Sequence, residues 1–286
     1  MKKIVISGAS GFVGTHLGDF LSKQGYHIDR LTRLDLSLSD KDLSERLNGV
    51  FAIINLNGAP LLHRWTPAYK ELLYTSRIKT TQKLANAIRL TTEKPGVFIS
   101  TSAVGIYKDK THNTERATQY DSGYLAKICR DWEAYALTNL KIIRTVIFRL
   151  GIVLSADGGA LKTLLPIFKM GLGGPVSHGD QGFPWIHLDD LLQAYLYMLE
   201  NPETNGIFNL TAPEILTNNQ FTKTLSAVVK RPAIFPVSQF ALKMRYGEGA
   251  VALLEGAFVE PLRLTESGFK FRYPNLQDAL TQIIAG

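Results

Sequence analysis

The first half of the chain alternates short apolar runs with longer segments whose apolar residues recur every three or four positions. Runs of strand length lie at 4–6, 27–31, 50–56, 97–100 and 142–150. Periodic segments that predict helices lie at 13–24, 40–47, 67–90 and 123–138. Runs such as FAIINL are apolar at nearly every position, as a parallel sheet covered on both faces requires. We therefore predict an α/β fold with a doubly wound parallel sheet.

Two of the predicted helices have recognisable starts. Ser39 precedes the segment at 40–47, and Thr66 precedes Pro67 at the start of the segment at 67–90. Serine and threonine oxygens accept hydrogen bonds from the first turn of a helix, and proline is well tolerated at its first position. We expect Ser39 and Thr66 to be N-caps.

A glycine-rich turn joins the first predicted strand to the first predicted helix, in the segment KIVISGASGFVGTHL at 3–17. Gly8 permits a tight turn, Gly11 lets the backbone approach a pyrophosphate, and Gly14 lets the helix pack close to the strand. The helix N-terminus offers free N–H groups to phosphate. This context predicts a Rossmann-type dinucleotide site. The candidate cofactor-binding residues in it are Gly8, Ser10, Gly11, Phe12, Val13 and Gly14.

After residue 151 the elements become shorter and are interrupted by glycine and proline. Helices are predicted at 189–201, 218–229, 237–246 and 247–254, and a strand at 206–210. We divide the chain into a nucleotide-binding Rossmann domain, 1–150, and a smaller, mainly helical substrate-side region, 151–286, with some segments returning to the sheet. The segment WIHLDDL holds His187, Asp189 and Asp190. We expect it to be structural rather than catalytic, with Asp189 or Asp190 capping the following helix.

Composition narrows the class of protein. The chain has 286 residues and a formal net charge of +7, but its Lys and Arg residues form no block typical of nucleic-acid binding. An anionic cofactor or substrate accounts for the charge, and no nucleic-acid partner is expected. No apolar run reaches membrane-spanning length, and the single cysteine, Cys129, excludes an internal disulfide. The histidines show no metal-ligand spacing. We expect a cytoplasmic protein, monomeric or homodimeric, with no metal and no membrane association.

The end of the second predicted strand bears on the choice of cofactor. NAD sites place an acidic residue there to hold the ribose 2′-hydroxyl, whereas this chain has Thr32 and then Arg33. A guanidinium binds a 2′-phosphate that a carboxylate would repel. We therefore predict NADP(H), with Thr32 and Arg33 in the site. Asp35 remains an alternative that could hold a ribose.

Polar and small residues follow the next two predicted strands. Leu56, Asn57 and Gly58 follow one strand, and Thr101 and Ser102 end the other. Ligands of an open α/β sheet bind at the carboxyl ends of its strands. We expect all five residues at the site, with the Ser102 hydroxyl positioning a substrate oxygen. Ordinary turn chemistry is the alternative for the hydroxyl residues.

Longer motifs make a resemblance specific. They are GASGFVG, LTR, INLNGAPL, RWTPAYKELLYTSRIKTT, STSAVGIY, CRDWE, RLGIVLSADGGAL, GLGGPV, WIHLDDL, FNLTAP and GFKFRYPNLQDAL. Together they cover residues 4 to about 280. The chain resembles the uncharacterised, YfcH-type epimerase-like family of the extended short-chain dehydrogenase/reductase superfamily, including that family's own C-terminal extension. The resemblance implies an NADP-binding Rossmann domain and a smaller substrate region, and it supplies no substrate.

The resemblance also implies a catalytic set that this chain carries in altered form. Extended reductases use a Ser or Thr and a Tyr-x-x-x-Lys pair, in which the lysine lowers the pKa of the tyrosine. Ser102 matches the serine, but Tyr124 is followed by Lys127 at i+3. In the other register, Leu125 and Cys129 fall on the paired positions. Because i+3 and i+4 share a helix face, Ser102, Tyr124 and Lys127 are the candidate catalytic residues.

Three further positions are interpreted through the same resemblance. Asn57 stands where the family usually has alanine, beside the expected cofactor. Arg77 lies near the place of a cofactor-side asparagine and is a candidate phosphate or substrate contact. Arg149 is a candidate anion anchor in the substrate pocket.

Taken together, the residues predict an NADP(H)-binding oxidoreductase or epimerase-like enzyme. Its substrate would be small and polar, either a nucleotide-sugar or another carbonyl compound, with hydride passing between nicotinamide and a carbon that bears oxygen. The alternative is a protein that senses NADP(H) without turnover, which the altered Tyr124 helix favours.

Overall fold

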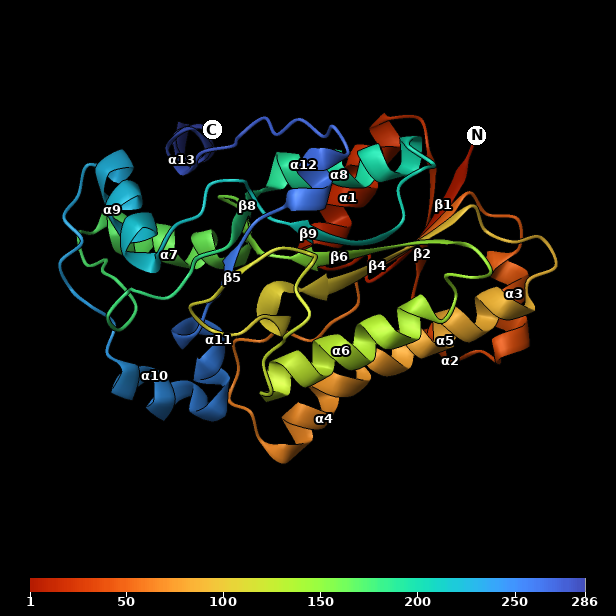
Figure 1. Ribbon diagram of the computed structural model, residues 1–286, viewed down its shortest axis with the longest axis horizontal. Helices are drawn as coiled ribbons and strands as arrows, with labels where there is room; N and C mark the ends of the chain where they lie inside the picture. Colours follow the sequence, from red (N-terminus) through yellow and green to blue (C-terminus); the bar gives the residue numbers. More distant parts are fainter. Residues whose placement is uncertain (286) are drawn as a thin grey trace.

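A parallel six-stranded sheet forms the centre of the computed structural model, which describes residues 1–285 (Figure 1). The strand order is β2-β1-β3-β4-β6-β9. The strands are β1 (Lys3–Ser7), β2 (His27–Leu31), β3 (Ala52–Asn55), β4 (Val97–Ala103), β6 (Arg144–Leu150) and β9 (Gly206–Leu210). The chain reverses its direction of winding between β1 and β3, where open α/β sheets bind their ligands. The predicted fold class is confirmed.

Helices cover both faces of this sheet, as Figure 1 shows. One layer contains α1 (Phe12–Lys23), α8 (Leu188–Glu200) and α12 (Leu262–Glu266). The other contains α3 (Asp40–Leu47), α4 (Pro67–Thr75), α5 (Ile78–Leu90) and α6 (Tyr124–Leu137). Short α2 (Arg33–Ser37) directly follows β2.

The alternation of side chains along β1 explains why its sequence is apolar throughout. Ile4 and Ile6 join the core beneath α1 and α8, together with Leu17. Val5 points to the opposite face and packs with Leu84 of α5. Each strand therefore contributes to two cores, which accounts for the continuous apolar runs.

The second half both completes the sheet and builds a smaller body beside it. Its β9 pairs with β6 in parallel, so a segment from beyond residue 151 supplies the edge strand. A separate apolar cluster includes Leu161, Trp185, Phe221 and Leu280. The helices that contribute to this cluster are α7 (Gly159–Lys169), α9 (Asn218–Val229) and α13 (Leu276–Ala285), and the second half also contains α10 (Gln239–Tyr246) and α11 (Val251–Leu254). The remaining short elements are β5 (His112–Asn113), β7 (Ile152–Leu154), β8 (Trp185–His187), β10 (Phe258–Val259), η1 (Val104–Ile106) and η2 (Gly247–Ala250).

Local predictions were confirmed where the first turn of a helix carries its own signal. Ser39 caps α3 and Thr66 caps α4, each accepting a backbone hydrogen bond. The cap of α8, however, is His187, whose Nδ1 accepts from Asp189 N at 3.0 Å, so the prediction that Asp189 or Asp190 caps it was wrong. Asp190 instead accepts the N–H groups of Arg272 and Tyr273, which ties α8 to the segment before α13.

The helix predicted over 67–90 is two helices, because contacts with the loop after β3 interrupt it. Ser76 ends α4, and its hydroxyl accepts a hydrogen bond from Ala59 N at 3.0 Å. The Arg77 guanidinium donates to the Ala59 carbonyl at 2.8 Å. Among residues 1–285, no helix is both long and apolar enough to cross a lipid bilayer.

Candidate functional site

The glycine turn has the geometry that its sequence predicts. Gly8 has φ +81°, and a Cβ atom there would lie 2.8 Å from the Leu56 carbonyl carbon. A Cβ on Gly14 would lie 2.3 Å from the Gly8 oxygen. Neither position has room for a side chain, so β1, the turn and α1 pack closely only with glycine.

The N-terminus of α1 is available to an anion. Gly11 occupies the cap position without a side-chain hydrogen bond, and the helix begins with Phe12 and Val13. Ser10 and Gly11 are exposed at the surface. The first N–H groups of a helix lack internal partners, so this turn suits a phosphate group.

The end of β2 presents Arg33 to solvent. Thr32 caps α2, and Arg33 is the first residue of that helix and is exposed. Asp35, the alternative ribose ligand, turns back toward the strand, and its Oδ2 accepts from Thr32 N at 2.6 Å and Thr32 Oγ1 at 2.7 Å. These hydrogen bonds lower the pKa of Asp35. The carboxylate is therefore ionised and already engaged.

A cavity of about 640 Å³ lies at the carboxyl ends of β3, β4 and β6, between α6 and segments of the second half. Most of its lining is apolar, and four carboxylates, Asp109, Asp121, Glu248 and Glu255, also border it. The predicted residues that line it are Leu56, Asn57, Gly58, Arg77, Thr101, Ser102 and Tyr124. Of the described lining residues, Arg77 alone carries a positive charge.

Arg77 is buried beside the residue that would approach a cofactor. Its guanidinium donates to the carbonyls of Leu73 and Ala59. A Cβ on Gly58 would lie 3.0 Å from the guanidinium carbon. Burial lowers the pKa of Arg77. Asn57, by contrast, turns its amide back to the Ser7 hydroxyl and to Asn55 Oδ1.

The hydroxyls at the end of β4 have buried partners. Ser102 Oγ donates to Glu133 Oε1 at 2.7 Å. The Thr101 hydroxyl lies 2.8 Å from the hydroxyl of Tyr195, a residue of α8. Ser102 still has lone pairs with which to accept a hydrogen bond.

Glu133 belongs to a buried ion pair that sequence analysis missed. Arg149 Nε donates to Glu133 Oε1 at 2.8 Å, and Arg149 Nη2 donates to Oε2 at 2.7 Å. Arg149 also donates to the hydroxyls of Tyr107 and Tyr120. Although burial alone would lower the pKa of Arg149, the bonds to Glu133 raise it above its ordinary value. The interpretation of Arg149 as an anion anchor was wrong, because its side chain is only 1% exposed and already donates to Glu133, Tyr107 and Tyr120.

One signal could have indicated this pair. Arg149 follows the apolar residues Val146, Ile147 and Phe148 of β6, and a buried charge is costly unless it is paired, so a carboxylate is the expected partner. The sequence does not say which carboxylate meets it, because Glu133 comes from a different element, α6.

The structure separates the two candidate catalytic residues of α6. The Tyr124 hydroxyl donates to the Lys70 carbonyl at 2.7 Å, and burial raises the pKa of Tyr124. Lys127 Nζ pairs with Asp131 at 2.6 Å and is half exposed, and it does not border the cavity. Tyr124 and Ser102 both line the cavity, whereas Lys127 does not join them there.

Leu125 and Cys129 both line the cavity one turn apart. Burial raises the pKa of Cys129 to about 12, so this thiol is protonated at neutral pH. In the register that puts Leu125 and Cys129 on the dyad positions, both residues line the cavity. In the other register, Tyr124 lines the cavity and Lys127 does not.

A dinucleotide-type glycine turn, an open parallel sheet and a cavity at its carboxyl edge define a Rossmann-type α/β fold. A model of the NAD dependent epimerase/dehydratase family matches residues 4–211, and a domain of unknown function, DUF1731, matches residues 237–283. The chain belongs to this epimerase/dehydratase family, as its motifs predicted.

Similarity to known relatives extends over nearly the whole chain. The "Epimerase family protein SDR39U1 homolog, chloroplastic" of Arabidopsis thaliana is 36% identical over 299 residues, covering 98% of this chain and 86% of that protein. "Epimerase family protein SH2119" of Staphylococcus haemolyticus is 34% identical, with 99% of each covered. The crystal structure of human epimerase family protein SDR39U1 (isoform 2) with NADPH superposes with a TM-score of 0.93 at 30% identity, covering 99% of both chains.

Proposed function

We propose that this protein binds NADP(H) at the carboxyl edge of its sheet. The observation that carries the proposal is the exposed Arg33 at the end of β2, where the neighbouring carboxylate of Asp35 is already engaged. The similarity to the human relative that was solved with NADPH supports it. The turn at Gly8–Gly14 would hold the pyrophosphate, and Leu56, Asn57, Gly58 and Thr101 would lie beside the rest of the cofactor.

Arg77 would supply a further positive charge near the cofactor. Its two described hydrogen bonds go to carbonyl groups, which do not neutralise it. A buried guanidinium gains from an anion within reach, because the surroundings screen charge weakly. We therefore include Arg77 among the cofactor-binding residues.

We further propose that the protein is an oxidoreductase or epimerase-like enzyme for an uncharged carbonyl compound. When bound, the cofactor would supply or take up the hydride. While it donates to Glu133, Ser102 would accept a hydrogen bond from the hydroxyl of the alcohol form of the substrate. The four carboxylates and the largely apolar wall favour this class over a nucleotide-sugar, whose diphosphate they would repel.

The role of Tyr124 as acid and base, with Lys127 lowering its pKa, stays a prediction. Tyrosine titrates near pH 10 unaided, and burial takes Tyr124 further from neutrality. Leu125 and Cys129 favour the second candidate function, a protein that holds NADP(H) and responds to its redox state without turnover.

The cofactor proposal is tested by titrating wild type and Arg33→Ala with NADPH and NADH. We expect wild type to prefer NADPH, and Arg33→Ala to lose about tenfold or more of that preference, as expected for one charge-assisted bidentate contact. Arg89→Ala removes an equal charge from the last turn of α5, far from the carboxyl edge, and should change neither affinity. An unchanged preference in Arg33→Ala would refute the role of Arg33.

The catalytic proposal is tested by NADPH oxidation with a panel of aldehydes and ketones. Because an epimerase consumes no net NADPH, turnover of nucleotide-sugars and other sugars is followed by product analysis instead. Turnover of an uncharged carbonyl that falls in Ser102→Ala supports the enzyme. Full activity in Tyr124→Phe removes Tyr124 as the acid or base. Tight NADPH binding without turnover across the panel favours the sensor.

A further inference from the structure

We propose that Arg46 is a positioning residue that sets the preference for NADP(H) over NAD(H) by occupying the Asp35 carboxylate. This inference rests on the proposed cofactor site. Arg46 lies on α3, and nothing in the sequence links it to the glycine turn or to β2.

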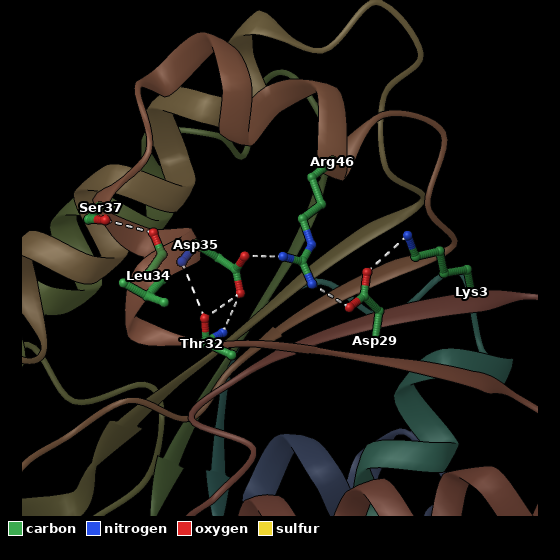
Figure 2. A network of polar contacts seen from close by, with 7 residues as sticks. All are labelled: Lys3, Asp29, Thr32, Leu34, Asp35, Ser37 and Arg46. Atoms are coloured by element: carbon green, nitrogen blue, oxygen red, sulfur yellow. Dashed lines mark hydrogen bonds and ion pairs between the residues drawn. The ribbon is translucent and has the colours of Figure 1, made fainter.

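The structure brings an acidic group to the end of β2 after all. Figure 2 shows Asp35 turned back from the first turn of α2 toward Thr32. Its Oδ2 accepts from both the N–H and the hydroxyl of Thr32. A carboxylate at the end of this strand is what an NAD site uses to hold the ribose 2′-hydroxyl. Left alone, Asp35 would therefore favour NAD(H) and repel a 2′-phosphate.

Arg46 reaches across from α3 and engages this carboxylate. One guanidinium nitrogen donates to Asp35 Oδ1, and Nη2 donates to Asp29 Oδ1 at 2.7 Å. Asp29, on β2, also pairs with Lys3 Nζ at 3.0 Å. The bidentate, planar guanidinium suits this bridge between two carboxylates better than a lysine would.

The charges around the end of β2 then balance without Arg33. Lys3 and Arg46 offset Asp29 and Asp35. Arg33 is exposed, and among residues 1–285 it forms no ion pair, so it is the cation available at the place expected for a 2′-phosphate. Removing Arg46 would leave one negative charge beside that phosphate and free one Asp35 oxygen for a ribose hydroxyl.

The experiment measures NADPH and NADH dissociation constants for wild type, Arg46→Gln, Asp35→Asn and the double variant. We expect Arg46→Gln to lower the NADPH-to-NADH preference about tenfold or more, with a smaller effect at high salt. Asp35→Asn should keep the wild-type preference or strengthen it, because Arg46 then has no carboxylate at that site to offset. The double variant should regain most of the preference, since the uncompensated carboxylate is gone.

Two further variants, Arg46→Lys and the surface control Arg89→Gln, distinguish an effect on cofactor preference from a general loss of protein stability. Arg46→Lys keeps the charge but not the bridge, and it should fall between wild type and Arg46→Gln. Arg89→Gln should behave as wild type. If Arg46→Gln does not fold, Arg46→Lys and Asp35→Asn still test the idea through their cofactor preference.

The measurements distinguish a failure of the role proposed for Arg46 from a failure of the proposed cofactor site. A wild type that binds NADPH, with a preference unchanged in Arg46→Gln or Arg46→Lys, overturns the role of Arg46 alone. The same holds if the double variant stays as impaired as Arg46→Gln, because Arg46 then does not act through Asp35. A wild type that binds neither cofactor overturns the proposed function as well.

Discussion

Replacing Glu133 by glutamine should destabilise the protein far more than an ordinary surface substitution. The change keeps the size of the side chain and removes its charge. Arg149 would remain among apolar and tyrosine side chains without a counter-ion, and Ser102 would lose a charged acceptor.

The size of the effect follows from burial. The side chains of Arg149 and Glu133 are 1% and 6% exposed, so water cannot replace the missing partner. Breaking a buried ion pair on one side costs about 3–5 kcal/mol. For a chain of this size, that cost corresponds to a fall in Tm of roughly 6–10 °C.

The assay is urea and thermal unfolding of Glu133→Gln beside a matched control on the same helix. Asp131 pairs with Lys127 at 2.6 Å, but the two side chains are 33% and 54% exposed. Asp131→Asn should therefore cost less than about 1 kcal/mol. The double change Glu133→Leu with Arg149→Met should regain part of the loss, because it removes both buried charges. A Glu133→Gln protein within about 1 kcal/mol of wild type would refute this reasoning.

Three further predictions test other parts of the structure. Cys129 should resist a thiol reagent at neutral pH in the folded protein and react once the protein is unfolded, because burial raises its pKa to about 12; rapid native labelling would contradict this. Burial lowers the pKa of His187, so the stability that its neutral ring provides is present above about pH 6.5 and lost as the pH falls through the folded pKa. Between pH 7.5 and 5.5, the free energy of unfolding of wild type should therefore fall relative to that of His187→Gln, by at most about 1.4 kcal/mol per pH unit. A difference in free energy that stays constant over this range would contradict a buried neutral ring. Gly14→Ala should weaken NADPH binding and stability together, because its Cβ would meet the Gly8 oxygen at 2.3 Å, and an unaffected variant would show that the turn is looser than the structure has it.

The sequence predicts those parts of the fold whose cause is local. Apolar runs such as residues 4–6 and 51–56 mark strands because both of their faces are buried. Ser39 and Thr66 mark helix starts because the cap is made within one turn. The glycine turn is recognisable because Gly8 and Gly14 have no room for a Cβ.

Contacts between residues that are far apart in the sequence could not be predicted in this way. The break before Arg77 arises from contacts with Ala59, and the loss of Arg149 as an anion anchor arises from Glu133. Likewise, Arg46 meets Asp35 only because α3 folds over the end of β2. Periodicity and spacing place each residue on an element, but they do not say which elements meet.

A crystal structure of the protein grown with NADPH tests the central claim most directly. We predict the 2′-phosphate beside Arg33, the pyrophosphate at the Gly8–Gly14 turn and the nicotinamide in the cavity beside Ser102. A crystal in which the glycine turn stays empty at saturating NADPH, or in which the cofactor binds elsewhere, would contradict the account.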